Sequence, residues 1–126
     1  MVQPQSVLST PLSFLIENQT SETVFETQLS EAIDVILSAL GDSTKEAIYR
    51  LLKKAYGINK EDIPNQIEGF ANAIEQTFGP VSKLIEIKII ERLHAKYKDF
   101  SYTPKKGELN FVEFVYNLQH HLELEA

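Results

Sequence analysis

Apolar residues recur every three or four positions through most of the chain, which is the spacing of one face of an α-helix. The first such stripe lies between residues 22 and 40, and Gly41 follows it as a helix stop. A second stripe runs over residues 43–56, and its opening letters, STKE, match a capping box in which two side chains satisfy each other's backbone N–H groups. Gly57 ends this stripe. The pattern therefore predicts two amphipathic helices in the first half of the chain.

Three further helical stripes follow, and breaks that contain Pro or Gly separate them. One covers residues 65–78 after Pro64, the next covers residues 80–97, and the last covers residues 108–122. Pro80 is tolerated at the first position of a helix, where the missing N–H group would have no partner. The five segments predict an all-α fold, a compact bundle of about five helices.

Residues 1–21 lack this periodicity and predict an irregular N-terminal arm, so a single helical domain is expected to occupy residues 22–126. Within the arm, PLSFLIEN can form either a short helix or a strand that pairs with DFSYT at residues 99–103. The arm has no basic leader, and Ser and Pro break its apolar runs. We therefore expect no signal peptide and no membrane span, and a cytoplasmic protein.

The composition excludes several kinds of chemistry. Without cysteine the chain can form no disulfide, thiolate metal site or cysteine nucleophile. His120 and His121 are adjacent, so on a helix they point about 100° apart and do not favour one shared metal ion. No Gly-rich phosphate loop or hydrolase motif is present. We predict no cofactor, no metal ion and no catalytic residue.

Charge is distributed unevenly along a chain whose net charge is −6. All 12 Lys and Arg residues lie between residues 45 and 106, whereas the segments on either side carry only acids. The candidate basic patch in this middle region consists of Arg50, Lys53, Lys54 and Lys60. Acids are interspersed among the bases and flank them, which opposes tight binding to phosphates. Nucleic acid is therefore an alternative partner and not the favoured one.

Glu86 stands out because it falls on the apolar side of the predicted helix 80–97. An ionised carboxylate without partners is costly to bury, so Glu86 must be paired, cap another helix, be protonated or face a groove. The favoured interpretation is a buried polar latch, with a subunit interface and a catalytic acid or base as alternatives. The candidate partners in the latch are Tyr49, Arg50, Lys83 and His94.

The last predicted helix is apolar around more than half of its circumference. The candidate interface residues in its first turns are Phe111, Val112, Phe114 and Tyr116. Such a helix is either sandwiched within its own domain or presents one side to another chain. We predict a homodimer formed by this helix and the helix 80–97, with a different protein as the alternative partner.

Two stretches, LGDSTKEAIYRLLKKAYGI at 40–58 and IEGFANAIEQTFGPVSKLIEIKIIERL at 67–93, resemble a small archaeal helical family of unassigned biochemistry, the Nitrosopumilus-type output domain. The likeness rests on LGDSTKEAIY, FANAIEQTFG and LIE, which are helix caps and core positions. The family pattern has Gly-x-Gly after the Phe, whereas here Gly79 is followed by Pro80 and Val81. The resemblance implies an archaeal, intracellular, all-helical module for regulation or interaction, without an active site to transfer.

These observations favour a non-enzymatic helical interaction or regulatory domain that self-associates. The first alternative is a nucleic-acid-associated regulator that uses the basic patch. The second is a small-molecule or enzymatic site, which predicts a cavity lined by Tyr49, Glu86 and His94.

Overall fold

The computed structural model describes residues 24–125, with the side chains of residues 24–124. Within this range the chain forms five α-helices and no strands, which confirms the all-α prediction. The helices are α1 (24–39), α2 (Asp42–Tyr56), α3 (Ile67–Phe78), α4 (Ser82–Lys96) and α5 (Phe111–Glu125). Two 3₁₀-helices, η1 (Lys60–Asn65) and η2 (Gly79–Val81), stand before and after α3. The predicted N-terminal arm lies outside the described residues.

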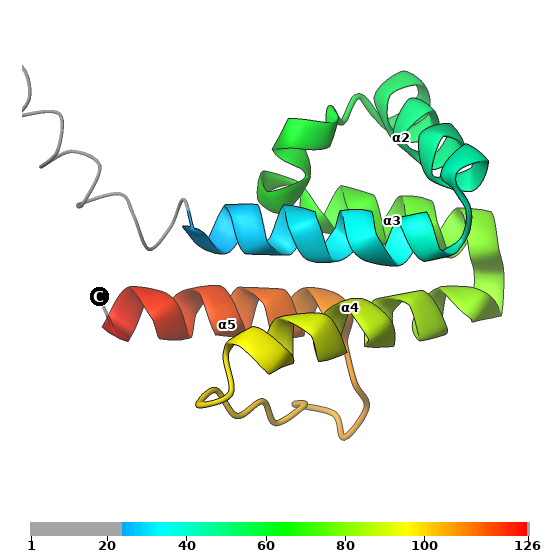
Figure 1. Cartoon of the computed structure of the whole chain (residues 1–126). Coiled ribbons are helices and arrows are strands. Elements are labelled where there is room, and N and C mark those ends of the chain that lie inside the picture. The colour runs from blue at the N-terminus through cyan, green and yellow to red at the C-terminus, as the bar shows by residue number, and fades with distance from the viewer. Residues whose placement is uncertain (1–23, 126) are drawn as a thin grey trace, which may run out of the picture.

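The central helix of the bundle is α3, which contacts α2, α4 and α5. In Figure 1, α4 and α5 run below α1 and α3, while α2 lies above them, away from α5. The connection between α4 and α5 forms a long loop at the bottom of this view. Residues 99–103, predicted as one half of a strand pair, belong to this loop and form no strand.

One hydrophobic core joins all five helices, and the predicted stripes supply most of it. The largest fully buried side chains are Phe25, Leu29, Ile33, Leu37, Leu52, Ile58, Ile63, Ile67, Phe70, Ile74, Ile89 and Phe114. Phe100 from the long loop packs edge-on against Phe114, with 5.7 Å between ring centroids. The loop therefore closes the core beside α5, because it contributes an aromatic side chain to it.

The ends of α2 depend on two glycines with positive φ angles. Gly41 is the N-cap at φ 112° and α2 begins at Asp42, so Ser43 already lies inside the first turn. No side chain caps this end, and the predicted capping box is therefore wrong. At the other end Gly57 has φ 67°, and the N–H group of Ile58 donates to the carbonyl of Leu52 at 3.0 Å. This is the predicted glycine stop, and it turns Ile58 into the core.

The packing of α3 against the connection that follows α2 is close at a third glycine, Gly69. A Cβ atom at Gly69 would lie 2.7 Å from Cδ1 of Ile58, which is closer than real carbon atoms approach. The connection lies outside the predicted stripes, but it winds into η1 and buries Ile63 and Pro64. Its apolar side chains therefore fix α2 against α3.

The last two helices begin later than their stripes predict. Pro80 lies within η2 (Gly79–Val81) instead of starting α4, and α4 begins at Ser82. The α5 helix begins at Phe111, three residues after the predicted start, because the Oδ1 atom of Asn110 accepts the N–H group of Glu113 at 2.8 Å. Asn is a favourable residue at this capping position. The cap places Asn110 at the edge of the site described next.

Candidate functional site

A polar hollow of about 310 Å³ lies where α3, α4 and the start of α5 meet. We call it the acidic hollow because three carboxylates face one lysine across it. Its lining residues are Glu68, Ala71, Asn72, Glu75, Lys83, Glu86, Asn110, Phe111 and Val112. The polar residues of α3 reach this hollow together because they are spaced by four and three positions, which puts them on one helix face.

Glu86 is the buried member of this lining. Its side chain is only 2% exposed, on a face of α4 that otherwise buries Ser82 and four aliphatic residues. Its Oε2 atom is buried and has no hydrogen-bond partner among the residues that the structure describes. A buried polar atom of this kind is rare in a folded protein, because each such atom loses its hydration without replacement.

The surroundings of Glu86 favour its protonated form. Burial raises the pKa of Glu86 to about 7, and the charge of the neighbouring Glu75 contributes in the same direction. Once protonated, Glu86 can donate a hydrogen bond to the Glu75 carboxylate, which further favours the proton, whereas the charge of Lys83 opposes these effects in part. Near neutral pH the carboxyl group of Glu86 therefore exists in both protonation states. In either state the hollow offers acceptor oxygens to a cation or to a hydrogen-bond donor.

The chemistry of the lining fits binding better than catalysis. It offers carboxylates, two amides and one ammonium group, but no hydroxyl, thiol or imidazole. A general acid or base near neutral pH is present in Glu86, but the lining gives it no nucleophile to activate. Among residues 24–125 no three acidic or histidine side chains are grouped so that they could hold a metal ion.

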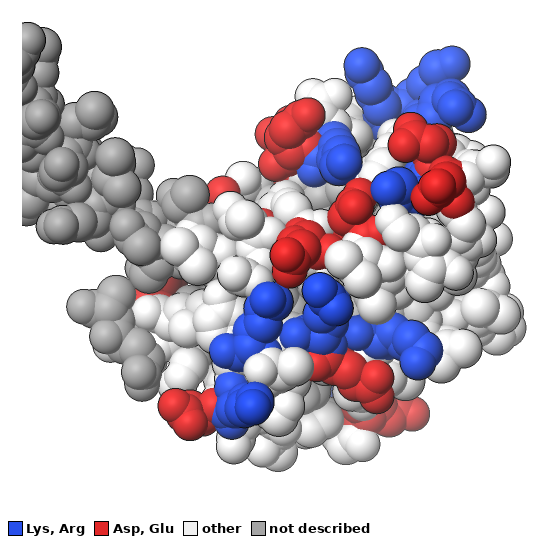
Figure 2. Space-filling model, in the orientation of Figure 1, with Lys and Arg blue, Asp and Glu red and all other residues white. Residues whose placement is uncertain are grey.

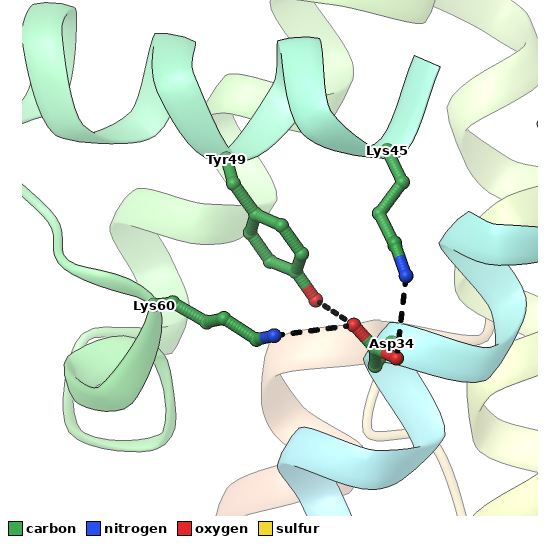
Figure 3. Close-up of polar contacts among 4 residues, drawn as sticks. All are labelled: Asp34, Lys45, Tyr49 and Lys60. Atoms are coloured by element: carbon green, nitrogen blue, oxygen red, sulfur yellow. Dashed lines mark hydrogen bonds and ion pairs between the residues drawn. The ribbon is translucent and has the colours of Figure 1, made fainter. Parts of the chain in front are cut away.

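A second carboxylate, the half-buried Asp34 on α1, has the opposite surroundings (Figure 3). Its Oδ1 atom accepts a hydrogen bond from the Tyr49 hydroxyl at 2.9 Å and lies 3.5 Å from Nζ of Lys60. Its Oδ2 atom lies 3.7 Å from Nζ of Lys45. We call these four residues the Asp34 cluster. It joins α1 to α2 and to η1.

The pKa shifts in the Asp34 cluster follow from this geometry. Burial alone would raise the pKa of Asp34, but the hydrogen bond from Tyr49 and the two lysine charges outweigh it and lower that pKa. Burial, and then the hydrogen bond to Asp34, raises the pKa of Tyr49 above its ordinary value. The cluster therefore holds an ionised carboxylate and a protonated phenol. Lys60 also lies 4.9 Å above the Tyr49 ring, a cation–π distance.

The structure does not bring the predicted latch together. Glu86 lines the acidic hollow, whereas Tyr49 hydrogen-bonds Asp34 and lines a different hollow with Arg50. Arg50 and His94 are exposed. The predicted cavity lined by Tyr49, Glu86 and His94 is therefore wrong. Of the candidate partners, Lys83 does line the hollow of Glu86, and its charge acts to lower the pKa of Glu86. The prediction failed for Tyr49, Arg50 and His94, and it missed the neighbouring carboxylate because that residue comes from α3.

The residues of the predicted interface on α5 also lie in different surroundings in the structure. Phe111 and Phe114 are buried in the core of their own chain and cannot form a contact surface. Val112 is half-buried at the acidic hollow, and Tyr116 is exposed, with its hydroxyl donating to Glu68 at 3.2 Å. The apolar breadth of α5 arises because the helix is covered on one side by α3 and on another by the long loop.

The predicted basic patch is mixed in charge. Arg50, Lys53 and Lys54 are exposed on α2, but Lys60 belongs to the Asp34 cluster. The hollow beside Arg50 and Lys53 is also lined by Glu46 and Glu61. Figure 2 shows the same mixture over a wider area, with acidic side chains between the basic ones across this face. Such a surface does not present the single sign of charge that phosphate binding favours.

Sequence reasoning missed the acidic partners of Glu86. Glu68, Asn72 and Glu75 stand at positions i, i+4 and i+7 of α3, so their common face was visible in the sequence. What the sequence does not give is the crossing of α3 and α4, which sets the acidic face of α3 beside Glu86.

Comparison of the chain with protein-family models, curated proteins and solved structures finds no match. The resemblance to the archaeal output domain therefore stays a hypothesis. None of the helices in the described part of the chain combines the length and apolarity that a membrane span needs.

Proposed function

We propose that this chain is a non-enzymatic helical interaction domain, and that its partner places a cationic group in the acidic hollow. The observation that carries the proposal is the Oε2 atom of Glu86, which is buried and lacks a hydrogen-bond partner among the described residues. An ammonium or guanidinium group would supply the missing donor and would also balance the carboxylates.

The contrast with the Asp34 cluster supports a binding role over a structural one. Asp34 has a hydroxyl and two ammonium groups around it, as a carboxylate that holds helices together requires. Glu86 has mainly another carboxylate beside it, and this arrangement destabilises the ionised form. Groups that are unfavourable for folding are retained most often where they serve binding or catalysis.

The cationic group would come from outside the chain's own first segment. Residues 1–23 contain no Lys, Arg or His, so none of their side chains can supply a cation to the hollow. Lys83 is the single basic residue in the lining and is exposed. A cation from a ligand or from another chain therefore suits the charge of the hollow.

Titration with butylammonium chloride, followed by two-dimensional NMR, tests this proposal. We expect shifts of backbone amides in α3, α4 and the start of α5, with a dissociation constant of about 1 mM, because so small a ligand makes few contacts. Glu86→Gln should weaken the binding several-fold, whereas Glu91→Gln, an exposed site on the same helix, should not change it. Shifts that are absent, or that are equal in both variants, would contradict the proposal.

The predictions about self-association, cellular location and archaeal origin stay predictions. The surface that was expected to mediate self-association is reduced, because Phe111 and Phe114 are buried within one chain. Light scattering over a range of concentrations tests it, and a monomer at the highest concentration would reject the dimer. The cytoplasmic setting and the archaeal origin are inferences from the sequence alone.

A further inference from the structure

A second hollow, of about 200 Å³, lies next to the acidic one and has more basic than acidic residues in its lining, three lysines against two glutamates. It is lined by Lys83, Lys105, Lys106 and the residues around the cap of α5, including Glu108, Asn110 and Glu113. The two hollows share Lys83 and Asn110, so they are neighbours across these two side chains. We call the second one the lysine hollow.

Glu108 and Glu113 offset two of the three lysine charges in the lysine hollow, and Glu113 is also held by hydrogen bonds. The Oε1 atom of Glu113 accepts the Tyr102 hydroxyl at 2.6 Å and the N–H group of Lys105 at 3.4 Å. This carboxylate is therefore engaged by the loop that it holds against α5. No side-chain ion pair within 4.0 Å involves Lys83, Lys105 or Lys106 among the described residues. Their ammonium groups thus keep their capacity to meet an anion.

We infer that the ligand of this site carries a cationic and an anionic group a few bonds apart. The cationic group would lie in the acidic hollow beside Glu86, and the anionic group would lie in the lysine hollow beside Lys105 and Lys106. Lys83 and Asn110 stand between them. The inference rests on the proposed function and adds the anionic half of the ligand.

The charges of the two hollows favour this ligand over a simple cation. A cation alone would gain from Glu68, Glu75 and Glu86 but would also be repelled by the nearby Lys83. An anionic group on the same molecule would offset that repulsion and would add attraction to two further lysines. The chain segment 1–23 has no cationic side chain, so it cannot provide such a pair through its side chains.

Calorimetric titration at low ionic strength tests the inference with three matched probes: 6-aminohexanoate, hexylammonium and hexanoate. We expect 6-aminohexanoate to bind about three- to tenfold more tightly than hexylammonium, which is the range that exposed charge pairs supply. Hexanoate should bind most weakly. Lys105→Ala with Lys106→Ala should remove the advantage of 6-aminohexanoate and leave hexylammonium within twofold. Lys88→Ala, an exposed site on α4, is the control and should leave both constants unchanged.

The outcomes separate the two proposals. If hexylammonium binds as tightly as 6-aminohexanoate, the anionic half is rejected and the proposed function stands. If neither binds, both are rejected. A further pair of probes, acetyl-Gly-Gly-Lys and its C-terminal amide, identifies the source of the charges. Tighter binding of the free acid than of 6-aminohexanoate would support a peptide terminus, and the reverse would support a small zwitterion.

Discussion

Asp34 and Glu86 are carboxylates on different helices of one bundle, and the groups that face them differ in charge. Asp34 accepts the Tyr49 hydroxyl and lies within ion-pair distance of two lysines that come from α2 and η1. Glu86 is more deeply buried, but its near neighbour on α3 is Glu75, and its Oε2 atom has no hydrogen-bond partner in the described part of the chain. The first carboxylate is satisfied within the fold, and the second is not.

The difference shows that the partners of a buried carboxylate, and not its burial, decide whether the fold stabilises its charge. Burial alone acts on both carboxylates in the same direction, towards a higher pKa. The partners decide the outcome, because the pKa of Asp34 is lowered overall while that of Glu86 is raised to about 7. A fold that only needed stability would favour an apolar or amide side chain at residue 86.

The largest expected effect comes from replacing Glu86 by Gln and varying the pH. The folded state holds a proton on Glu86 up to about pH 7, whereas the unfolded state loses it near 4.5, the ordinary pKa of a glutamate side chain. The folded state therefore binds more protons in this window, so the stability of the natural chain falls as the pH rises from 4.5 through 7. The penalty reaches about 3 kcal/mol above pH 7. Glu86→Gln lacks the ionised form and should be more stable than the natural chain by about 2–3 kcal/mol at pH 8, with little difference at pH 4.5.

Urea unfolding at the two pH values measures this effect, and Glu91→Gln on the exposed side of α4 is the matched control. A loss of stability in Glu86→Gln at pH 8 would mean that the ionised carboxylate has a structural partner, and the contrast with Asp34 would disappear. The same variant also enters the butylammonium titration. A chain that becomes more stable while binding more weakly would show directly that Glu86 serves binding.

A smaller effect of the opposite sign is expected for Asp34→Asn. The variant removes the negative charge that strengthens the hydrogen bond from Tyr49 and also removes two partly exposed ion pairs, so the free energy of unfolding at pH 7 should fall by about 1–2 kcal/mol. Because the pKa of Asp34 is lowered, its contribution is present above the ordinary carboxyl pKa and is lost as the pH falls through the folded value. Tyr49→Phe should cost about 1 kcal/mol and should add little once Asp34 is replaced. If the losses in the free energy of unfolding add up in the double variant, the hydrogen bond does not couple Tyr49 to Asp34.

The sequence predicted the helices well because apolar spacing and glycine stops are local signals. All five helices formed, and Gly57 ends α2 with Ile58 turned into the core, as its position indicated. Most of the errors lie at helix starts, where competing local solutions exist, although α5 also ends at Glu125 and not at the predicted residue 122. Asp42 extended α2 backwards by one residue, η2 took the first turn of the segment 80–97, and the Asn110 cap moved α5 forward. Each error at a helix start concerns hydrogen bonds that the apolar pattern does not encode.

The candidate site could be predicted only in part, because a site depends on how helices cross. Periodicity along one helix was enough to mark Glu86 as an acid on an apolar face. It could not show that the facing residue is Glu75, or that Tyr49 pairs with Asp34 at a separation of 15 residues. The same limit explains why the apolar pattern of α5 predicts an interface at residues that are core. The helix that covers Phe111 comes from a distant part of the chain, and the loop that covers Phe114 directly precedes α5 but must fold back onto it.

The smallest expected effect is that of replacing Glu31. This residue is a reference for the stability that the Asp34 cluster contributes. Like Asp34, Glu31 on α1 faces two basic residues, with Arg92 at 3.8 Å and Lys96 at 3.6 Å. Its side chain is 49% exposed, however, and no hydroxyl hydrogen bond to it is present among the described residues. Glu31→Gln should therefore lower the free energy of unfolding by no more than about 0.5 kcal/mol, and 0.5 M salt should abolish the difference. Since each site has two paired cations, the larger loss expected for Asp34→Asn measures the hydrogen bond from Tyr49 and the deeper burial. Equal losses at the two sites would mean that ion pairing alone holds α1 to its neighbours.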